Sequence, residues 1–146
     1  MRIVGEWFAC TDGVLRPVLE GYADDVAGGD CQERFLVDTG ADATVFTAGF
    51  AHRLGLPGSL PPVGVELAGV GGSQAHVLVR TTLTLYADDG SPARIQGEFS
   101  AFIDPAATDM SILGRDVLDH FDLIVSRPRN EVVLLATNHR YRVEPP

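Results

Sequence analysis

The sequence contains no lysine. Its basic residues are eleven arginines, which are outnumbered by twenty Asp and Glu residues, and the net charge is −9. Proteins that bind nucleic acid need a basic face to neutralise phosphates, and anionic membrane surfaces also attract basic segments. We therefore expect neither a nucleic acid nor a membrane among the partners of this chain.

Long apolar runs are missing as well. No segment approaches the roughly 20 residues of a membrane-spanning helix, and the N-terminus lacks the basic-then-apolar pattern of a secretion signal. Cysteine is scarce, and we expect Cys10 and Cys31 to be reduced, mostly buried thiols, because a chain of this size needs no disulfide. The four histidines show no metal-ligand spacing. These absences predict a cytoplasmic protein and argue against a zinc site.

The 146 residues suffice for one domain, which we expect to span 1–146. Sixteen Gly, nine Pro and many short Val, Leu and Thr runs favour β-structure over a helical bundle. The one clear helical segment is Ala48–Leu54, which Gly55 and Pro57 would end. The predicted strands are Ile3–Ala9, Val14–Tyr22, Cys31–Val37, Val63–Leu67, Ala75–Leu85, Ala93–Ile103, Ser111–Gly114, Leu123–Ser126 and Val132–Ala136, with a helical turn or two over Arg115–His120.

The most informative segment is the apolar run 35–37, which ends abruptly in Asp38, Thr39 and Gly40. Such a run is typical of a buried strand, here followed by a turn of small residues. An isolated charge at the end of a core strand is costly, so Asp38 needs compensating partners or a chemical use. The motif occurs once in the chain.

Three elements follow one another: the segment Asp38-Thr39-Gly40-Ala41-Asp42, a glycine-rich hairpin tip at 69–72, and the segment Ile112-Leu113-Gly114-Arg115-Asp116. This order resembles the retroviral-type, or retropepsin-like, aspartic proteases and their cellular and bacterial single-lobe relatives. The resemblance covers about residues 35–118. It implies an all-β fold, a closed, barrel-like acid-protease lobe with a flap hairpin and one or two short helices.

The resemblance also implies a function, namely an aspartic endopeptidase, whose chemistry needs no metal or organic cofactor. Such an enzyme needs two carboxylates that share a proton, one acting as general base on a water and the other donating to the scissile carbonyl. Because this chain has one such loop, the resemblance implies a homodimer in which two copies of Asp38 meet on the two-fold axis.

The residues after Asp38 are small or hydroxyl-bearing, and Thr39 and Gly40 have two interpretations each. In the family, Thr39 resembles a strut that hydrogen-bonds across the dimer axis, but its hydroxyl could also cap its own turn. Gly40 would allow close approach of substrate, or be an ordinary turn glycine. Ala41 cannot donate a hydrogen bond that would stabilise an ionised carboxylate, so we expect a less acidic activity optimum than Ser or Thr would give.

Asp42 and Arg115 occupy positions that the family uses for a structural ion pair behind the active-site loop. We expect this pair to be buried and bidentate. The alternative is two independent surface charges.

The resemblance assigns a flap to Gly69, Val70, Gly71 and Gly72, which would close over the substrate. A phosphate cradle fits less well, because the third glycine of a dinucleotide fingerprint and the lysine of a P-loop are missing. By position, Val45, Met110 and Ile112 resemble residues that line the family's substrate groove, although each could instead be a core residue. Such a groove would prefer extended peptides with hydrophobic side chains.

Two other functions stay open. The chain could be a catalytically inactive, protease-like domain that binds peptides or assembles with a partner. It could also transfer phosphoryl groups through Asp38, but such enzymes have parallel α/β sheets with alternating helices, and this sequence has few helical patterns.

Overall fold

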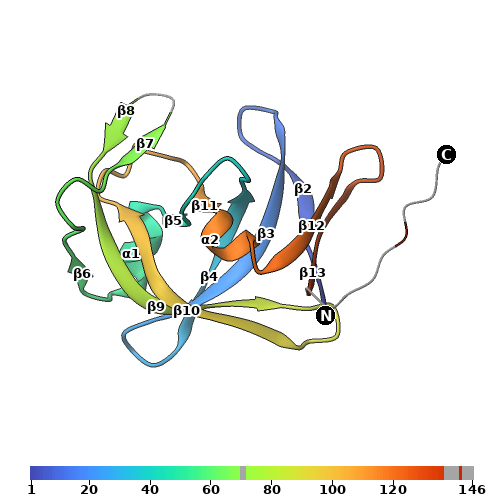
Figure 1. The fold of residues 1–146 in the computed structure, drawn as a ribbon, viewed down its shortest axis with the longest axis horizontal. Coiled ribbons are helices and arrows are strands. Elements are labelled where there is room, and N and C mark those ends of the chain that lie inside the picture. The colour runs from blue at the N-terminus through green and yellow to red at the C-terminus, as the bar shows by residue number, and fades with distance from the viewer. Residues whose placement is uncertain (70–71, 137–141, 143–146) are drawn as a thin grey trace.

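Six strands close into a barrel (Figure 1). A computed structural model describes residues 1–69, 72–136 and 142 of the chain. The barrel closes where β3 pairs with β9, with Tyr22 opposite Thr84. In order, its strands are β3 (Leu15–Asp24), β4 (Asp30–Val37), β11 (Ser111–Leu113), β5 (Val45–Phe46), β10 (Pro92–Phe102) and β9 (His76–Tyr86). The expected all-β, barrel-like fold with two short helices is confirmed.

Two segments far apart in the sequence are neighbouring strands in the wall of this barrel. Strand β11 runs parallel to β4, with Leu113 opposite Val37, and antiparallel to β5, with Ile112 opposite Val45. The ends of β4 and β11 therefore lie side by side. This pairing places the segment that follows Val37 next to the segment that follows Leu113.

Aromatic side chains fill one end of the core. Phe35, Phe46 and Phe50 are completely buried, and their rings meet edge to face with centroids 5.0–6.0 Å apart. Burial of each such side chain contributes about 1.5–3 kcal/mol to folding. At the end of β4, Phe35 and Val37 are buried and Leu36 between them is partly exposed. The packing of Phe35 and Val37 in the core anchors the strand that leads to Asp38.

The short helix α1 (Ala48–Leu54) has the predicted bounds. The Thr47 side chain caps it by accepting a hydrogen bond from the amide of Phe50, and Gly55 ends it in the left-handed conformation at φ 66°. Both signals are local, and they are the usual helix boundaries. The second helix, α2 (Arg115–Leu118), follows β11 directly.

The first predicted strand is wrong as one unit, because Gly5 divides it. Strand β1 (Arg2–Val4) pairs with β13 (Glu131–Ala136) in a separate sheet with β12 (Phe121–Ser126), whereas β2 (Glu6–Ala9) pairs with β3. The Gly5 amide donates to the Val132 carbonyl, and a Cβ at Gly5 would lie 2.2 Å from the Val18 carbonyl oxygen. Close backbone packing therefore switches the chain between sheets here.

The expected strand Val63–Leu67 is also wrong, since strand β7 (Leu67–Gly69) begins only at its last residue. Two prolines precede a turn in which the Val65 amide donates to the Pro62 carbonyl, and Gly64 has φ 87°. Strand β7 forms a hairpin with β8 (Gly72–Gln74), and Ala75 separates β8 from β9. A further short strand, β6 (Gly58–Ser59), pairs with β9.

Cys10 and Cys31 are both free thiols, but both are partly exposed. The expectation of mostly buried thiols is wrong, because Cys10 lies in the β2–β3 turn and Cys31 near the outer start of β4. Within the described part of the chain, no helix has the length and apolar character required to span a bilayer. The described residues also contain no group of three or more His, Cys, Asp or Glu side chains that could hold a metal ion.

Candidate functional site

The loop after β4 is a tight turn that holds the Asp38 carboxylate in place. The Asp38 amide donates to the Leu113 carbonyl at 3.1 Å, and the Gly40 amide donates to Asp38 Oδ1 at 2.9 Å. A Cβ at Gly40 would lie only 3.2 Å from that oxygen, so the turn itself favours glycine. Asp38 is half-buried, whereas Thr39 and Gly40 are exposed.

Helix α2 supports this loop from the other side. The Arg115 amide donates to the Ala41 carbonyl at 2.8 Å, and the Asp116 amide donates to the Asp42 carbonyl at 3.2 Å. Gly114 lies so close to the loop that an added Cβ would be 2.4 Å from the Ala43 carbonyl carbon. The segments that the sequence separates by more than 70 residues are thus docked backbone to backbone.

A buried hydroxyl completes the connection. Thr44 is completely buried, and both its amide and its Oγ1 donate to Asp116 Oδ1, at 2.9 and 2.7 Å. The same Oγ1 accepts a hydrogen bond from the Gly114 amide at 3.0 Å. These hydrogen bonds connect the buried Thr44 to Asp116, which is exposed on α2, and a polar network in which every member has a partner rigidifies its surroundings.

The expected ion pair forms, but it is not buried. Arg115 Nη2 contacts Asp42 Oδ1, and the two side chains are 51% and 84% exposed. The expectation of a buried pair is therefore wrong for the single chain, because the Asp42 carboxylate points outward while its backbone faces α2. Exposed pairs of this kind contribute about 0–1 kcal/mol.

The residues expected to line a groove lie along β5 and β11. Val45 and Ile112 are directly opposite each other and so share one face of the sheet. Val45 is 4% exposed but lies outside the main core cluster, and Ile112 is partly exposed. Met110, two residues before Ile112, is also partly exposed and lines a pocket described below.

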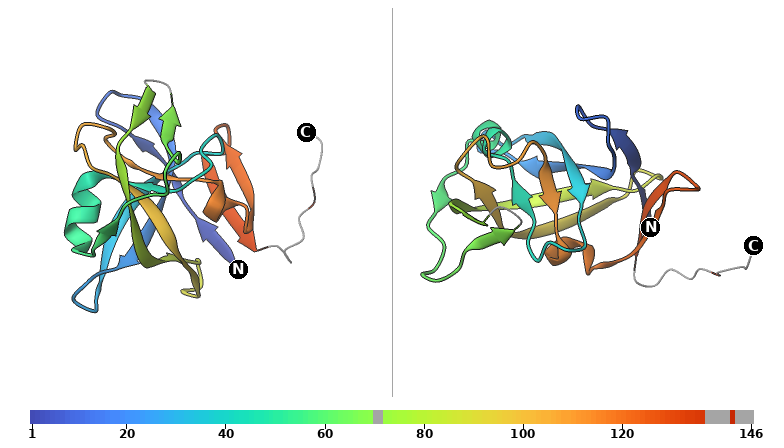
Figure 2. Two further views of the ribbon diagram at one scale, coloured as in Figure 1. Left: turned by 60° about the vertical axis from the view of Figure 1, so that its left-hand side comes forward. Right: turned by 90° about the horizontal axis from the view of Figure 1, so that it is seen from above.

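The β7–β8 hairpin projects from the same end of the barrel as the β4–β5 loop and the β2–β3 hairpin, which is visible in two orientations (Figures 1 and 2). Gly69 is opposite Gly72 in this hairpin, and Gly72 has φ 99°. The expected flap residues Val70 and Gly71 lie outside the described residues.

The family model for aspartyl proteases matches residues 25–117, which is more than half of the chain. The chain belongs to the aspartyl protease family. A search of curated proteins finds no match to it.

Three solved structures are similar to this chain. A retropepsin-like aspartic protease from Rickettsia conorii is 17% identical, with a TM-score of 0.55 over 92% of this chain and 90% of that one. EIAV protease complexed with the inhibitor HBY-793 is 25% identical, with a TM-score of 0.49 over 71% and 86%. The retroviral protease-like domain of Ddi1 from Leishmania major is 20% identical, with a TM-score of 0.45 over 83% and 96%. The Rickettsia structure supports a retropepsin-like fold.

The roles of two residues of the candidate site, Thr44 and Asp116, were not predicted from the sequence. Two signals could have identified them. A single hydroxyl in the apolar run 43–46 needs a buried partner, and an acidic residue in the first turn of a helix is favoured there. Neither signal says that the two residues meet.

We expect Thr44→Val to lower the free energy of unfolding by about 2 kcal/mol, because it leaves the buried Gly114 amide without its acceptor and removes the hydroxyl's hydrogen bond to Asp116. Thr44→Ser, which keeps the hydroxyl, should recover much of this loss. Arg115→Ala is the control that removes only the exposed pair, and it should cost less than about 1 kcal/mol. Denaturant unfolding measures all three. Equal losses for Thr44→Val and Arg115→Ala would contradict this assignment.

Proposed function

We propose that this chain is an aspartic endopeptidase that acts as a homodimer. The observation that carries the proposal is the Asp38 loop, which α2 and Gly114 hold rigidly while Thr39 and Gly40 stay exposed. The sequence has one such loop, and the mechanism needs two carboxylates. A second copy of the chain supplies the other Asp38.

The exposed tip of the loop suits a contact between two copies. Within the part of the chain that the structure describes, the Thr39 hydroxyl makes no hydrogen bond, so it is available to the partner loop. We propose that the two Thr39 hydroxyls brace the dimer across its axis. The hydrogen bonds among Thr44, Asp116 and Gly114 attach the Asp38 loop to α2 and would keep each Asp38 carboxylate in a fixed position relative to its own barrel.

The proposed reaction follows from the paired carboxylates. One Asp38 is ionised and takes a proton from a water, whose oxygen attacks the scissile carbonyl carbon. The other is protonated and donates its proton to the carbonyl oxygen, so that a tetrahedral gem-diol forms. As the C–N bond breaks, the protonated carboxyl group gives its proton to the leaving amine and the ionised carboxylate takes a proton from a hydroxyl of the gem-diol. A carboxylic acid and an amine leave, and the pair again holds one proton.

We place the peptide between the floor of the site and the β7–β8 hairpin. Val45 and Ile112 share one face beside the Asp38 loop, and Met110 extends this apolar surface. An extended peptide presents side chains alternately, so such a wall favours hydrophobic residues next to the cut bond. The glycines at 69 and 72 let the hairpin approach the peptide backbone closely.

Digestion of a peptide library tests the proposal, with and without a statine-type inhibitor of aspartic proteases. We expect cleavage that the inhibitor blocks, in parallel with a dimer in sedimentation experiments. A strictly monomeric chain at high concentration would overturn the mechanism and favour a non-catalytic, peptide-binding domain. Cleavage that the inhibitor leaves unchanged would contradict the carboxylate chemistry.

The activity of Ala41→Ser should extend to lower pH than that of the wild type. The Ala41 amide already donates to the Asp38 carbonyl at 3.2 Å, so position 41 lies against the carboxylate-bearing residue. A serine hydroxyl there can donate to the ionised carboxylate and keep it ionised at lower pH. The measurement is the pH profile of kcat/KM for one peptide. An unmoved profile, or an acidic limb displaced upward, would show that position 41 does not tune the pair.

A further inference from the structure

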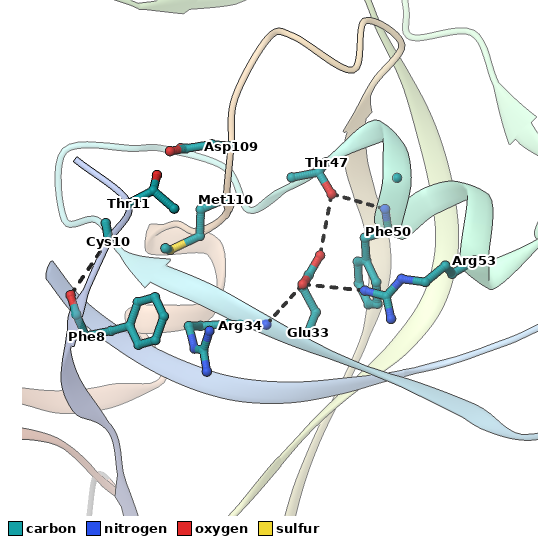
Figure 3. A pocket seen from close by; sticks show the side chains of 11 residues that line it. Phe8, Cys10, Thr11, Glu33, Arg34, Thr47, Phe50, Arg53, Asp109 and Met110 are labelled. Atoms are coloured by element: carbon teal, nitrogen blue, oxygen red, sulfur yellow. Dashed lines mark hydrogen bonds and ion pairs between the residues drawn. The ribbon is translucent and has the colours of Figure 1, made fainter. Parts of the chain in front are cut away.

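A pocket of about 520 Å³ lies on the flank of the barrel, away from the Asp38 loop. It is formed by the β2–β3 hairpin, β4, α1 and the segment that precedes β11 (Figure 3). None of the roles proposed above uses it, apart from the shared residue Met110. Its most unusual feature is an arginine.

The Arg34 guanidinium lies against the Phe8 ring, with its central carbon 3.8 Å from the ring centroid. Its Nε is buried and has no hydrogen-bond acceptor. Among the described residues, no carboxylate forms an ion pair with Arg34, whereas Arg2, Arg16, Arg53, Arg80, Arg94 and Arg115 are all paired. In a chain of net charge −9, a half-buried arginine without an anion is exceptional.

The neighbouring acid, Glu33, is already committed elsewhere. Its carboxylate is 3.5 Å from Arg53 Nη2, accepts a hydrogen bond from Ser111 Oγ at 3.1 Å, and receives a longer one from Thr47 Oγ1. Figure 3 shows Glu33 between Thr47 and Arg53, and Arg34 beside Phe8. Asp109 lies at the pocket with its side chain exposed to water. Of the two arginines that line the pocket, Arg53 has an ion-pair partner and Arg34 has none among the described residues.

The walls around Arg34 are fixed. Arg34 lies directly opposite Glu20 in the backbone ladder of β3 and β4, although the two side chains form no ion pair, and Phe8 lies opposite Arg16 in the ladder of β2 and β3. The hairpin tip is held by two contacts between Arg16 and Asp12, at 2.7 and 3.0 Å, and this pairing lowers the pKa of Asp12 to about 2. A preformed cationic site binds without a large ordering cost.

The pocket also adjoins the proposed peptide groove. Met110 lines the pocket, and two residues later Ile112 is opposite Val45 on the groove wall. A peptide that passes along this wall can therefore reach the pocket with a group outside the cleavage site.

We propose that the Arg34 pocket binds a carboxylate of the peptide that occupies the groove. The N–H groups of the guanidinium donate hydrogen bonds to the carboxylate, while the Phe8 ring packs against the flat face of the guanidinium. This arrangement suits arginine and not lysine. This proposal rests on the proposed function for the position of the peptide. The carboxylate belongs either to an acidic side chain or to the end of the peptide.

Binding to the full chain carrying Asp38→Asn tests the proposal, because binding does not require cleavage. The probes are fluorescent, extended hydrophobic peptides with an amidated C-terminus, in which one Glu or one Gln is moved through each position. A second set has Gln, never Glu, at the varied position and a free C-terminus in place of the amide. If a side-chain carboxylate binds, the Glu peptide should bind about tenfold more tightly than the Gln peptide at one position. If the peptide terminus binds, the free C-terminus should give the same gain in affinity over the amide.

Arg34→Ala should remove this preference for the carboxylate. Arg34→Glu should reverse it, so that the Gln peptide binds more tightly than the Glu peptide. The matched control is Arg129→Ala, which makes the same change of net charge on the exposed β12–β13 turn and should leave the preference intact. Asp109→Asn should strengthen binding of the acidic peptide a few-fold, because it removes the opposing charge. It also serves as a test if the Arg34 variants fold poorly.

A carboxylate preference at no position, or one that persists in Arg34→Ala, would overturn the proposal. So would an acidic peptide that binds Asp109→Asn no better than the parent. These outcomes are separate from the catalytic test: a wild-type chain that binds acidic peptides through Arg34 but cleaves none would disprove the proposed activity and leave the Arg34 pocket standing.

Discussion

Asp38→Asn should lower peptide cleavage by about 10²–10⁴-fold, because an amide can neither accept the proton of the attacking water nor hold a proton for the carbonyl oxygen. The fold should be unaffected. The only hydrogen bond to the Asp38 side chain within the described residues comes from the Gly40 amide, and the oxygen of Asn can accept it equally well. Kinetics with one library-derived peptide, combined with thermal melting, measure both effects.

Asp119→Asn is the matched control, since it makes the same chemical change at the exposed end of α2 and should leave cleavage unchanged. Mixing equal amounts of wild type and Asp38→Asn adds a test of the dimer. If subunits exchange, random pairing leaves about a quarter of the dimers with two carboxylates, so the activity of the wild-type protein should fall to about half. An additive result, in which the wild type keeps its full activity after exchange, would contradict a shared site, as would cleavage by Asp38→Asn at the wild-type rate.

Gly114→Ala should lower the free energy of unfolding by about 3 kcal/mol. Its backbone, at φ −94° and ψ −176°, is acceptable for any residue, so the effect has a purely steric origin. The new Cβ would lie 2.4 and 2.5 Å from the carbonyl carbon and oxygen of Ala43, and backbone cannot rotate away as a side chain can. The Asp38 loop and α2 would have to separate, and cleavage should fall with stability.

Gly49→Ala provides a control of opposite sign. Gly49 lies inside α1, and a Cβ there would meet no atom within 4 Å. Alanine should therefore stabilise the helix by about 0.5–1 kcal/mol. Thermal or denaturant unfolding of the two variants is a direct comparison of the same added methyl group at two positions. If Gly114→Ala unfolds like the wild type, the close docking of the loop on α2 is not required for the fold.

Much of the framework could be predicted from local signals. The capped helix Ala48–Leu54 has the expected bounds, because a threonine cap and a terminal glycine act within a few residues. The Phe35–Val37 strand ahead of Asp38 was equally clear, since its apolar run and the following turn are adjacent in the sequence. The combination of Asp-Thr-Gly, a glycine-rich hairpin and the Ile112–Asp116 segment resembled the family to which the chain belongs.

Other features depended on contacts between distant residues. The sequence suggested one strand where Gly5 divides two, because the reason for the break is the approach of Val18 and Val132 from elsewhere in the chain. Asp42 and Arg115 could be paired by analogy, but their exposure is a property of how the loop faces α2.

By itself, then, the sequence determined the strand-rich class, the capped helix and the single acid-bearing loop, because turns, caps and apolar periodicity act over a few residues. Tertiary structure alone decided that Thr44 meets Asp116, 72 residues away, and that Arg34 remains without an acidic partner in its pocket. The physical reason is that these relations depend on strand register and barrel closure. A shift of one residue in the pairing of β4 with β11 would turn the side chains of one strand to the opposite face and would move α2 along the Asp38 loop, so that Asp116 no longer faced Thr44.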